Sequence, residues 1–274
     1  MSEKKLYLNS SDISFIKNLI HEAGLLAKSI QKGDMDLKRK DDSSIVTRAD
    51  FEVQEMLISG LSSRFPGMKF IHEENFDPDA LKIDDDSLYA IIDPVDGTAM
   101  FSMRLPIWCV SVGIFRGAVP AYGFVFAPSA DMFFYNDESR AYLNDEPVKA
   151  VMIDKVDSET NIFFASEVKG IFSIDFPGKI RNLGSTAFHA ALLADNRRNR
   201  SLAFAGMSMI WDWAGAIPVL LKAGTGIQYL NGNEIDFRKV ISNGCVFQDF
   251  VIAYNTENFE KVRDYFIPIL PHAF

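Results

Sequence analysis

Asp93 and Asp96 flank a predicted sharp turn in the first half of the chain, directly after the apolar residues 89–92. The apolar run predicts a short buried strand, and the proline and glycine that follow predict a turn at its end. Both carboxylates lie close enough along the chain to face one cation. Gly97 and Thr98 can offer backbone N–H groups to an oxyanion if a helical turn follows. The spacing therefore predicts a site for a hard metal ion and an oxyanion together.

The turn also has a plainer explanation, since Asp-Pro and Asp-Gly pairs are common in exposed loops without a ligand. Three other segments place acids beside apolar elements: Asp50 near the start of a predicted helix, Glu73 and Glu74 after a predicted strand at 68–71, and Asp212. Each has a structural alternative as well. Asp50 is a favourable charge at a helix start, the glutamate pair is typical of a surface, and Asp212 fits the N-cap of a helix reaching Lys222.

Of the four acidic segments, the central turn and the Glu73-Glu74 pair follow apolar strands, and strand ends are where open α/β sheets place their chemistry. Glu73 lies at the end of the strand predicted over residues 68–71, and Asp93 lies at the end of the next one. We therefore expect two adjacent strand ends to bring these carboxylates together.

Taken together and in order, the four segments resemble the signatures of the inositol monophosphatase family of Mg²⁺-dependent, lithium-sensitive phosphatases. Residues 46–50 are similar to its Val-Thr-x-x-Asp element, 72–74 to Gly-Glu-Glu, 93–101 to Asp-Pro-Ile/Val-Asp-Gly-Thr-x-Asn-Phe, and 211–215 to Trp-Asp-x-Ala-Gly/Ala. His72 replaces the usual glycine and Met100 the usual asparagine. The resemblance spans about residues 10 to 255.

The resemblance implies hydrolysis of a small phosphomonoester, such as a sugar, inositol or nucleotide phosphate, with two or three Mg²⁺ ions. It implies that Glu73, Asp93 and the carbonyl of Val95 hold the ion that activates water. Asp93, Asp96 and Asp212 would hold an ion nearer the leaving-group oxygen. It leaves Glu74 as an acid that either supports the site or lies at the surface.

The resemblance assigns the catalytic roles to Glu73, Thr98 and Asp50. Thr98, supported by Asp50, would orient the attacking water. The N–H groups of Gly97 and Thr98 would hold the phosphate. His189, by contrast, is expected to be a packed or surface histidine, because no nucleophile pattern accompanies it.

The implied substrate contacts come from both halves of the chain and are Asp96, Gly97, Thr98, Gly184, Ser185, Ala205 and Asp212. Ser185 is expected to cap a helix of small residues. In inositol-specific members a glutamate stands seven residues before the Trp-Asp aspartate, and this position is Ala205 here. The change weakens myo-inositol 1-phosphate as a substrate. It leaves fructose 1,6-bisphosphate, histidinol phosphate, 3′-phosphoadenosine phosphates and nicotinamide-nucleotide phosphates open.

Two other functions remain alternatives to an enzyme. The departures at His72, Met100 and Ala205 suit a catalytically degenerate member that binds a phosphate ligand or regulates a partner. A metal-binding structural domain without turnover is the second. The survival of every expected metal carboxylate argues against the first alternative, because a degenerate enzyme usually loses those residues first. Metal-dependent phosphate release would separate both alternatives from an enzyme.

The composition limits the partners and the compartment. The formal net charge is −9 and no long run of Lys and Arg is visible, which disfavours nucleic-acid binding. Cys109 and Cys245 have no metal-ligand spacing and indicate no disulfide framework, as expected in a reducing cytoplasm. No apolar run approaches a membrane span, so we expect a cytoplasmic protein without membrane contact. The resemblance implies a homodimer.

The elements that must position these residues are a mixture of helices and strands. Residues 110–115, 119–126, 132–135 and 140–143 alternate with turns and predict an antiparallel meander, and another strand is expected at 161–166. Periodicity alone predicts only mixed α and β structure. The resemblance implies an α+β fold, a layered α-β-α-β-α sandwich. We expect an N-terminal subdomain, residues 1–155, with most metal ligands, and a C-terminal subdomain, residues 156–274, that completes the site.

Overall fold

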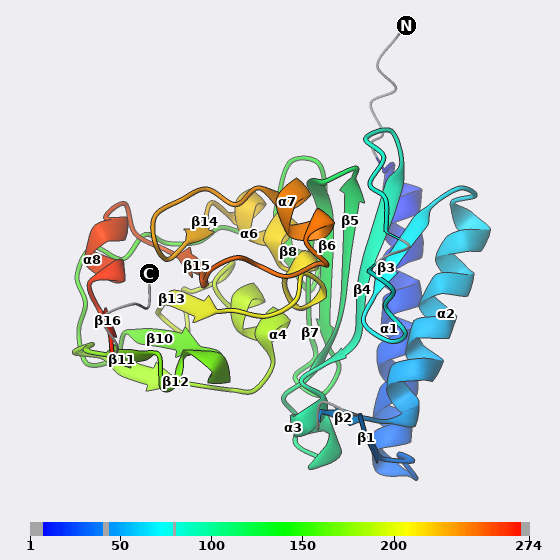
Figure 1. Ribbon diagram of the computed structural model, residues 1–274, viewed down its shortest axis with the longest axis horizontal. Helices are drawn as coiled ribbons and strands as arrows, with labels where there is room; N and C mark the ends of the chain where they lie inside the picture. The colour runs from blue at the N-terminus through cyan, green and yellow to red at the C-terminus, as the bar shows by residue number, and fades with distance from the viewer. Residues whose placement is uncertain (1–7, 41–43, 79–80, 270–274) are drawn as a thin grey trace, which may run out of the picture.

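The computed structural model describes residues 8–40, 44–78 and 81–269, which stack in alternating layers of helix and sheet (Figure 1). From right to left in Figure 1, these are α1 with α2, a large sheet, a group of short central helices, a smaller sheet and α8. The α+β, layered α-β-α-β-α sandwich expected from the sequence is therefore confirmed.

The outer helical layer consists of α1 (Ser10–Lys32) and α2 (Arg48–Arg64). Both helices cover one face of the large sheet with apolar side chains such as Ile16, Ile20 and Leu57, which are fully buried. At the start of α2, the Thr47 side chain accepts from a backbone N–H, and Asp50 accepts from the Thr47 backbone N–H at 2.8 Å. This capping box fixes Asp50 at the inner end of the helix.

The large sheet has seven strands in chain order, and only its first pair is parallel. The strands are β3 (Lys69–His72), β4 (Leu88–Asp96), β5 (Cys109–Arg116), β6 (Val119–Ala127), β7 (Met132–Asn136), β8 (Ala141–Leu143) and β9 (Glu146–Val148). The predicted meander is confirmed as β5 to β8. Because β3 and β4 run parallel, their carboxyl ends meet at one edge of the sheet.

The central layer packs against the other face of this sheet through α4 (Thr186–Ala191), α5 (Trp211–Ala214), α6 (Ile217–Ala223) and α7 (Phe237–Ser242). Two glycines of the sheet permit a very close approach. A Cβ atom on Gly113 would lie 2.4 Å from the Ala214 carbonyl oxygen, and one on Gly123 would lie 2.1 Å from that of Gly215. The backbone at the end of α5 therefore rests directly on β5 and β6.

The second sheet has the strand order β12-β10-β13-β15-β14, and α8 (Phe259–Arg263) covers its outer side. Its strands are β10 (Asn161–Phe164), β12 (Lys179–Arg181), β13 (Ser201–Gly206), β14 (Gly226–Tyr229) and β15 (Val251–Tyr254). The expected strand at 161–166 is thus shorter, because the chain turns into the 3₁₀ helix η1 (Ser166–Val168). The division expected near residue 155 falls between the two sheets, and it stays a prediction.

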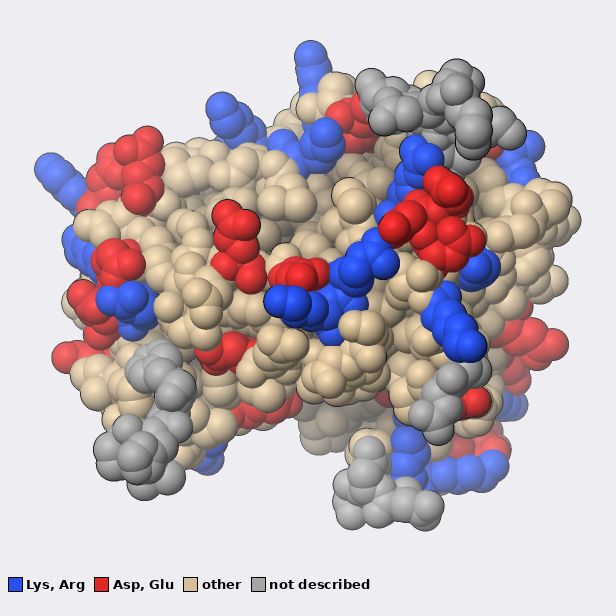
Figure 2. All heavy atoms as spheres, turned by 45° about the horizontal axis from the view of Figure 1, so that its top comes forward, with Lys and Arg blue, Asp and Glu red and all other residues tan. Residues whose placement is uncertain are grey.

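Several short elements complete the described chain: β1 (Lys38–Arg39), β2 (Ile45–Val46), α3 (Thr98–Ser102), β11 (Phe172–Ile174) and β16 (Phe266–Pro268). No helix among the described residues is both long and apolar enough to cross a membrane. On the face drawn in Figure 2, basic and acidic side chains are interspersed and form no continuous basic band among the residues coloured there.

Candidate metal centre and adjoining pocket

The central turn is built from an irregularity at the end of β4. Asp93 pairs with Ser111 and Asp96 pairs with Cys109, so three steps along β4 oppose two steps along β5. Such a bulge turns the side chains that follow it, whereas residues three apart in a regular strand point to opposite faces. Gly97 then adopts a left-handed conformation, with φ of 92°, and α3 begins at the next residue. The helical turn that the N–H groups of Gly97 and Thr98 require is therefore present.

Asp93, Asp96 and Asp212 form a compact acidic cluster. One carboxylate oxygen from each lies within 4.8 Å of those of the other two. Asp93 and Asp96 are buried, at 1% and 5% exposed, and Asp212 is partly buried. Two carboxylates come from β4, while the third comes from α5, which the glycines of the sheet hold close. The structure thus brings together three of the carboxylates predicted to bind metal.

The expectation that Asp212 caps one continuous helix is wrong. Ile210 occupies the capping position, Asp212 lies inside α5, and the helix breaks before α6. Pro218 near the start of α6 has no N–H to continue the ladder, and its ring conflicts with a preceding helical turn. Asp212 instead accepts the Met209 backbone N–H at 2.8 Å. This hydrogen bond fixes the carboxylate to the loop between β13 and α5. Gly224 ends α6 in a left-handed conformation, as a helix stop should.

Glu73 directly follows β3, but it is not part of the compact cluster, whose carboxylate oxygens lie within 4.8 Å of one another. Its carboxylate oxygen Oε1 lies 3.3 Å from Lys40 Nζ, and Lys40 also binds Glu74 at 2.7 Å. Glu74 is 3% exposed, so it is not the surface acid that was one of the two alternatives. The Gln54 side chain further holds the Glu74 backbone. Sequence reasoning missed Lys40, which lies 33 residues before Glu73 and has no local pattern that indicates this contact.

Asp50 and Thr98 meet as the sequence predicted. The Thr98 hydroxyl lies 2.9 Å from the Val95 carbonyl oxygen and 3.3 Å from Asp50 Oδ1. Asp50 is fully buried, and its other oxygen accepts the Thr47 hydroxyl at 2.7 Å. The hydroxyl therefore lies between the end of β4 and the start of α2.

Asp96 connects the central turn to α4. It accepts the Ser185 hydroxyl, the Thr186 N–H at 3.1 Å and the Ala187 N–H at 2.8 Å. Ser185 is the N-cap of α4, as predicted, and accepts from the Phe188 N–H. Gly184 lies against the central turn too, because a Cβ atom on Gly97 would be 3.0 Å from the Gly184 carbonyl oxygen. The central turn and residues 184–187, about 90 residues apart in the chain, thus lie against each other. We call these two segments the wall around Asp96.

Ala205 lies in β13 of the second sheet. It is fully buried in β13 among the apolar residues of the second sheet, and its neighbour across the ladder is Phe164. A methyl group in such a core offers a ligand no hydrogen bond. Its carbonyl oxygen accepts the Ala165 N–H at 2.9 Å, and its role as a substrate contact stays a prediction.

The carboxylates strongly perturb one another. Burial raises the pKa of Asp93 well above its ordinary range, and Glu73, Asp96 and Asp212 raise it further. Burial and then the charge of Asp96 raise the pKa of Asp212 to about 7. Burial raises the pKa of Glu73 to about 8, against the opposing charge of Lys40. Burial also raises the pKa of Asp50 to about 6. An all-oxygen cluster of this kind fits a hard divalent cation, whose charge offsets the repulsion.

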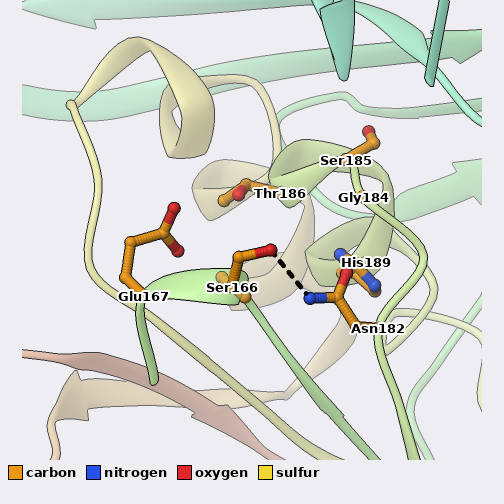
Figure 3. A pocket seen from close by; sticks show the side chains of 8 residues that line it. Ser166, Glu167, Asn182, Gly184, Ser185, Thr186 and His189 are labelled. Carbon is orange, nitrogen blue, oxygen red and sulfur yellow. Dashed lines mark hydrogen bonds between the residues drawn. The ribbon is translucent and has the colours of Figure 1, made fainter. Parts of the chain in front are cut away.

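A small pocket of about 70 Å³ lies between η1 and the start of α4 (Figure 3). Ser185 and Thr186 belong both to its lining and to the wall around Asp96. The remaining polar lining comes from Ser166, Glu167, Asn182 and His189. Sequence reasoning missed the first three of these residues, because they lie in η1 and in the loop after β12 without a recognisable pattern.

Comparison with known proteins gives consistent matches over nearly the whole chain. A sequence model of the inositol monophosphatase family matches residues 9–262. Inositol monophosphatase 1 of Mus musculus is 26% identical over 264 residues, covering 90% of this chain and 94% of the mouse protein. The same-named protein of Solanum lycopersicum is 28% identical over 271 residues, covering 89% and 96%.

Solved structures show the same fold. An IMPase from Thermotoga maritima superposes with a TM-score of 0.77 at 23% identity, covering 93% of this chain and 96% of that one. A staphylococcal inositol monophosphatase-1, soaked in LiCl as an inhibitory complex, gives a TM-score of 0.78 at 17% identity, covering 93% and 94%.

Proposed function

The chain belongs to the inositol monophosphatase family of phosphoric monoester hydrolases, and from this premise we propose that it hydrolyses a small phosphomonoester with Mg²⁺ at the Asp93, Asp96 and Asp212 cluster. The single observation that supports this proposal most is the meeting of these three carboxylates within 4.8 Å. The sugar, inositol or nucleotide phosphates named for the family are the candidate substrates.

Hydrolysis of a phosphate ester needs positive charge on the phosphoryl oxygens, an activated water and a stabilised leaving group. Mg²⁺ ions, two or three in number, would supply that positive charge and lower the pKa of a water. Glu73, Asp93 and the Val95 carbonyl would hold one ion. Asp93, Asp96 and Asp212 would hold another, with all ligands being oxygen atoms that suit Mg²⁺.

The chain's own groups would position the reactants. Thr98 would orient a water, a role supported by the contacts of its hydroxyl with Asp50 and with the Val95 carbonyl. The backbone N–H groups of Gly97 and Thr98 would bind the phosphate. Gly184 and Ser185 would form the opposite wall, supported by the hydrogen bond from Ser185 to Asp96.

The family relationship suggests further properties of this chain. We propose a homodimer in the cytoplasm and inhibition by Li⁺, the last supported by the LiCl complex of the staphylococcal relative. A degenerate binding protein is less well supported, since Asp93, Asp96 and Asp212 are all present and meet in one place.

The test is phosphate release from a panel of small phosphomonoesters, with Mg²⁺, with EDTA, and with Li⁺ added to Mg²⁺. We expect hydrolysis that requires Mg²⁺ and falls with Li⁺. Asp93→Asn should abolish it while the protein still folds. Asp86→Asn is a matched control, because it makes the same change at a side chain that is 93% exposed and is not part of the buried cluster. Full activity in Asp93→Asn, or release that EDTA does not affect, contradicts the proposal.

A further inference from the structure

A basic pocket lies on a part of the surface that supplies none of the clustered carboxylates. Its volume is about 450 Å³, within the range of about 300–1,000 Å³ that small-molecule sites occupy. The charged side chains that line it are Arg140, Lys149, Arg197 and Lys222, and its lining contains no Asp or Glu. We call this cavity the basic pocket.

The four cations of the basic pocket come from segments that are separate in the chain. Arg140 lies in the turn between β7 and β8, Lys149 follows β9, Arg197 follows α4, and Lys222 lies in α6. Two hydrogen bonds hold these segments together. The Ala150 N–H donates to the carbonyl oxygen of residue 223 at 2.9 Å, and Lys222 Nζ donates to that of residue 138 at 2.6 Å. The fold therefore gathers like charges, which repel one another until an anion binds.

The turn that carries Arg140 is ordered before any ligand binds. The Asp137 carboxylate accepts the N–H groups of Ser139 at 2.7 Å and of Arg140 at 2.8 Å. It also accepts the Tyr142 hydroxyl at 2.6 Å. These bonds engage Asp137 within the turn and leave the exposed Arg140 guanidinium at the pocket.

Most of the positive charge in the basic pocket is not neutralised by a neighbouring acid. Arg197 is paired, with its Nε 2.6 Å from Asp195 Oδ1. Among the residues that the structure describes, Arg140, Lys149 and Lys222 form no ion pair with a carboxylate. The formal net charge of the chain is −9, so this local excess of cations contrasts with the charge of the whole protein.

A second hollow of about 560 Å³ adjoins the basic pocket, because the two share Val148 and Arg197 in their linings. It offers an apolar surface from Met132, Leu143 and Leu192. Its charges balance, since it is lined by two acids, Glu146 and Asp195, and by two arginines, Arg197 and Arg198. A ligand with its anionic groups in the basic pocket would thus find room here for an uncharged part.

We propose that the basic pocket binds a small molecule that carries two phosphate groups. Arginine and lysine side chains form strong charge-assisted hydrogen bonds with phosphate oxygens, and the planar guanidinium of arginine can bind two oxygens at once. Two phosphate groups bring about three to four negative charges near pH 7, which matches four converging cations. A long nucleic acid fits less well, because it would extend beyond the pocket over a protein of net negative charge. The proposal involves neither Mg²⁺ nor the carboxylate cluster, so it does not depend on the proposed function.

The test is isothermal titration calorimetry of the full chain with methylenediphosphonate, which carries two phosphonate groups and resists hydrolysis. The buffer is freed of metal by a chelating resin and contains about 0.15 M KCl, which screens weak surface attraction. Without metal, the carboxylate cluster repels the probe. We expect methylenediphosphonate to bind about tenfold or more tightly than inorganic phosphate, because it engages more of the cations.

Charge changes in the basic pocket locate the binding. Lys149→Glu should raise the Kd of methylenediphosphonate about tenfold or more, since it replaces an attraction by a repulsion. Lys261→Glu makes the same change at an exposed position on α8 and should leave the Kd within about twofold. Lys222→Gln and Arg140→Gln remove one charge each and should raise the Kd about threefold or more, which keeps the test open if Lys149→Glu does not fold. Thermal melting confirms the folding of each variant.

Absence of binding to methylenediphosphonate would overturn the proposal, as would a Kd that is unchanged in all the folded pocket variants. A single-stranded DNA of about twenty nucleotides is a further probe. If it bound more tightly than methylenediphosphonate and lost its binding in Lys149→Glu, the surface would be a nucleic-acid site and the proposal would be wrong. Phosphate release with Mg²⁺ is measured separately, so failure of either proposal leaves the other standing.

Discussion

Thr98 Oγ1 lies 3.3 Å from Asp50 Oδ1. This contact joins the start of α2, in the outer helical layer, to the central turn after β4. The same hydroxyl contacts the Val95 carbonyl, which we propose as a metal ligand. Asp50 is itself fixed by two hydrogen bonds from Thr47. The orientation of Thr98 therefore depends on the capping of α2.

Removing this hydroxyl should slow catalysis without unfolding the protein. We expect Thr98→Ala to lower kcat by about 10²–10⁴, the range typical of a lost proton-transfer or water-orienting group. Thr98→Ser keeps the hydroxyl and should retain most of the activity. Steady-state kinetics on the best substrate of the panel measure kcat for both variants. Equal activity in the Ala and Ser variants would show that the Thr98 hydroxyl has no role in the reaction.

Lys40 should stabilise the fold through Glu74. Lys40→Met leaves the buried Glu74 carboxylate without its ammonium partner, at a cost of about 1–3 kcal/mol after allowance for the partial exposure of Lys40. Lys38→Met is the control, because the Lys38 pair with Asp36 is largely exposed and should contribute almost nothing. Urea denaturation measures both variants. A Lys40 variant as stable as the Lys38 variant would contradict this role.

The metal-free protein should lose stability as the pH rises. Asp212 and Glu73 have folded pKa values of about 7 and 8, above ordinary values near 4, so the native state binds protons more tightly than the unfolded state. Their contribution is fully present below about pH 4 and is lost as the pH rises through 7 and 8. In EDTA, the melting temperature should be lower at pH 8 than at pH 5.5, and Mg²⁺ should reverse this. Asp93→Asn should reduce the dependence, and a melting temperature in EDTA that rises over this interval is the contrary result.

Gly113 should be intolerant of any side chain. Gly113→Ala places a Cβ atom 2.4 Å from the Ala214 carbonyl oxygen, so α5 must move away from β5. We expect a loss of about 1–3 kcal/mol and a lower affinity for Mg²⁺, because Asp212 moves with the helix. Gly33→Ala meets its nearest atom at 3.7 Å and should change neither property. Calorimetry of unfolding and of Mg²⁺ binding tests the pair, and unchanged Mg²⁺ affinity in Gly113→Ala would refute the link.

The sequence predicted the elements that pair with their neighbours along the chain. The meander from β5 to β8 follows from short turns between apolar runs, because such turns fix both pairing and register. The acids of β3 and β4 were predictable too, since parallel strands end at the same edge. Pro218 was a visible signal for the break after α5, although the apolar pattern on both sides of it favoured one longer helix.

The rest depends on contacts between distant segments. Lys40 reaches Glu74 because β1 and β2 pair beside the sheet, and no spacing in the sequence encodes that distance. Ser166 and Asn182 meet only because β10 and β12 are neighbours in the second sheet. The order of the strands in the sheet therefore brings these residues together at the pocket. That order cannot be derived from a single sequence.

The separate origins of the cluster and the pocket have a consequence for how such a protein can diversify. The three clustered carboxylates come from β4 and α5, whereas Ser166, Glu167 and Asn182 come from turns around β10 and β12 that supply none of them. Substitutions in η1 or in the loop after β12 would alter the pocket while the three carboxylates keep their positions on β4 and α5. The scaffold can thus vary the surroundings of its cluster independently of the cluster itself.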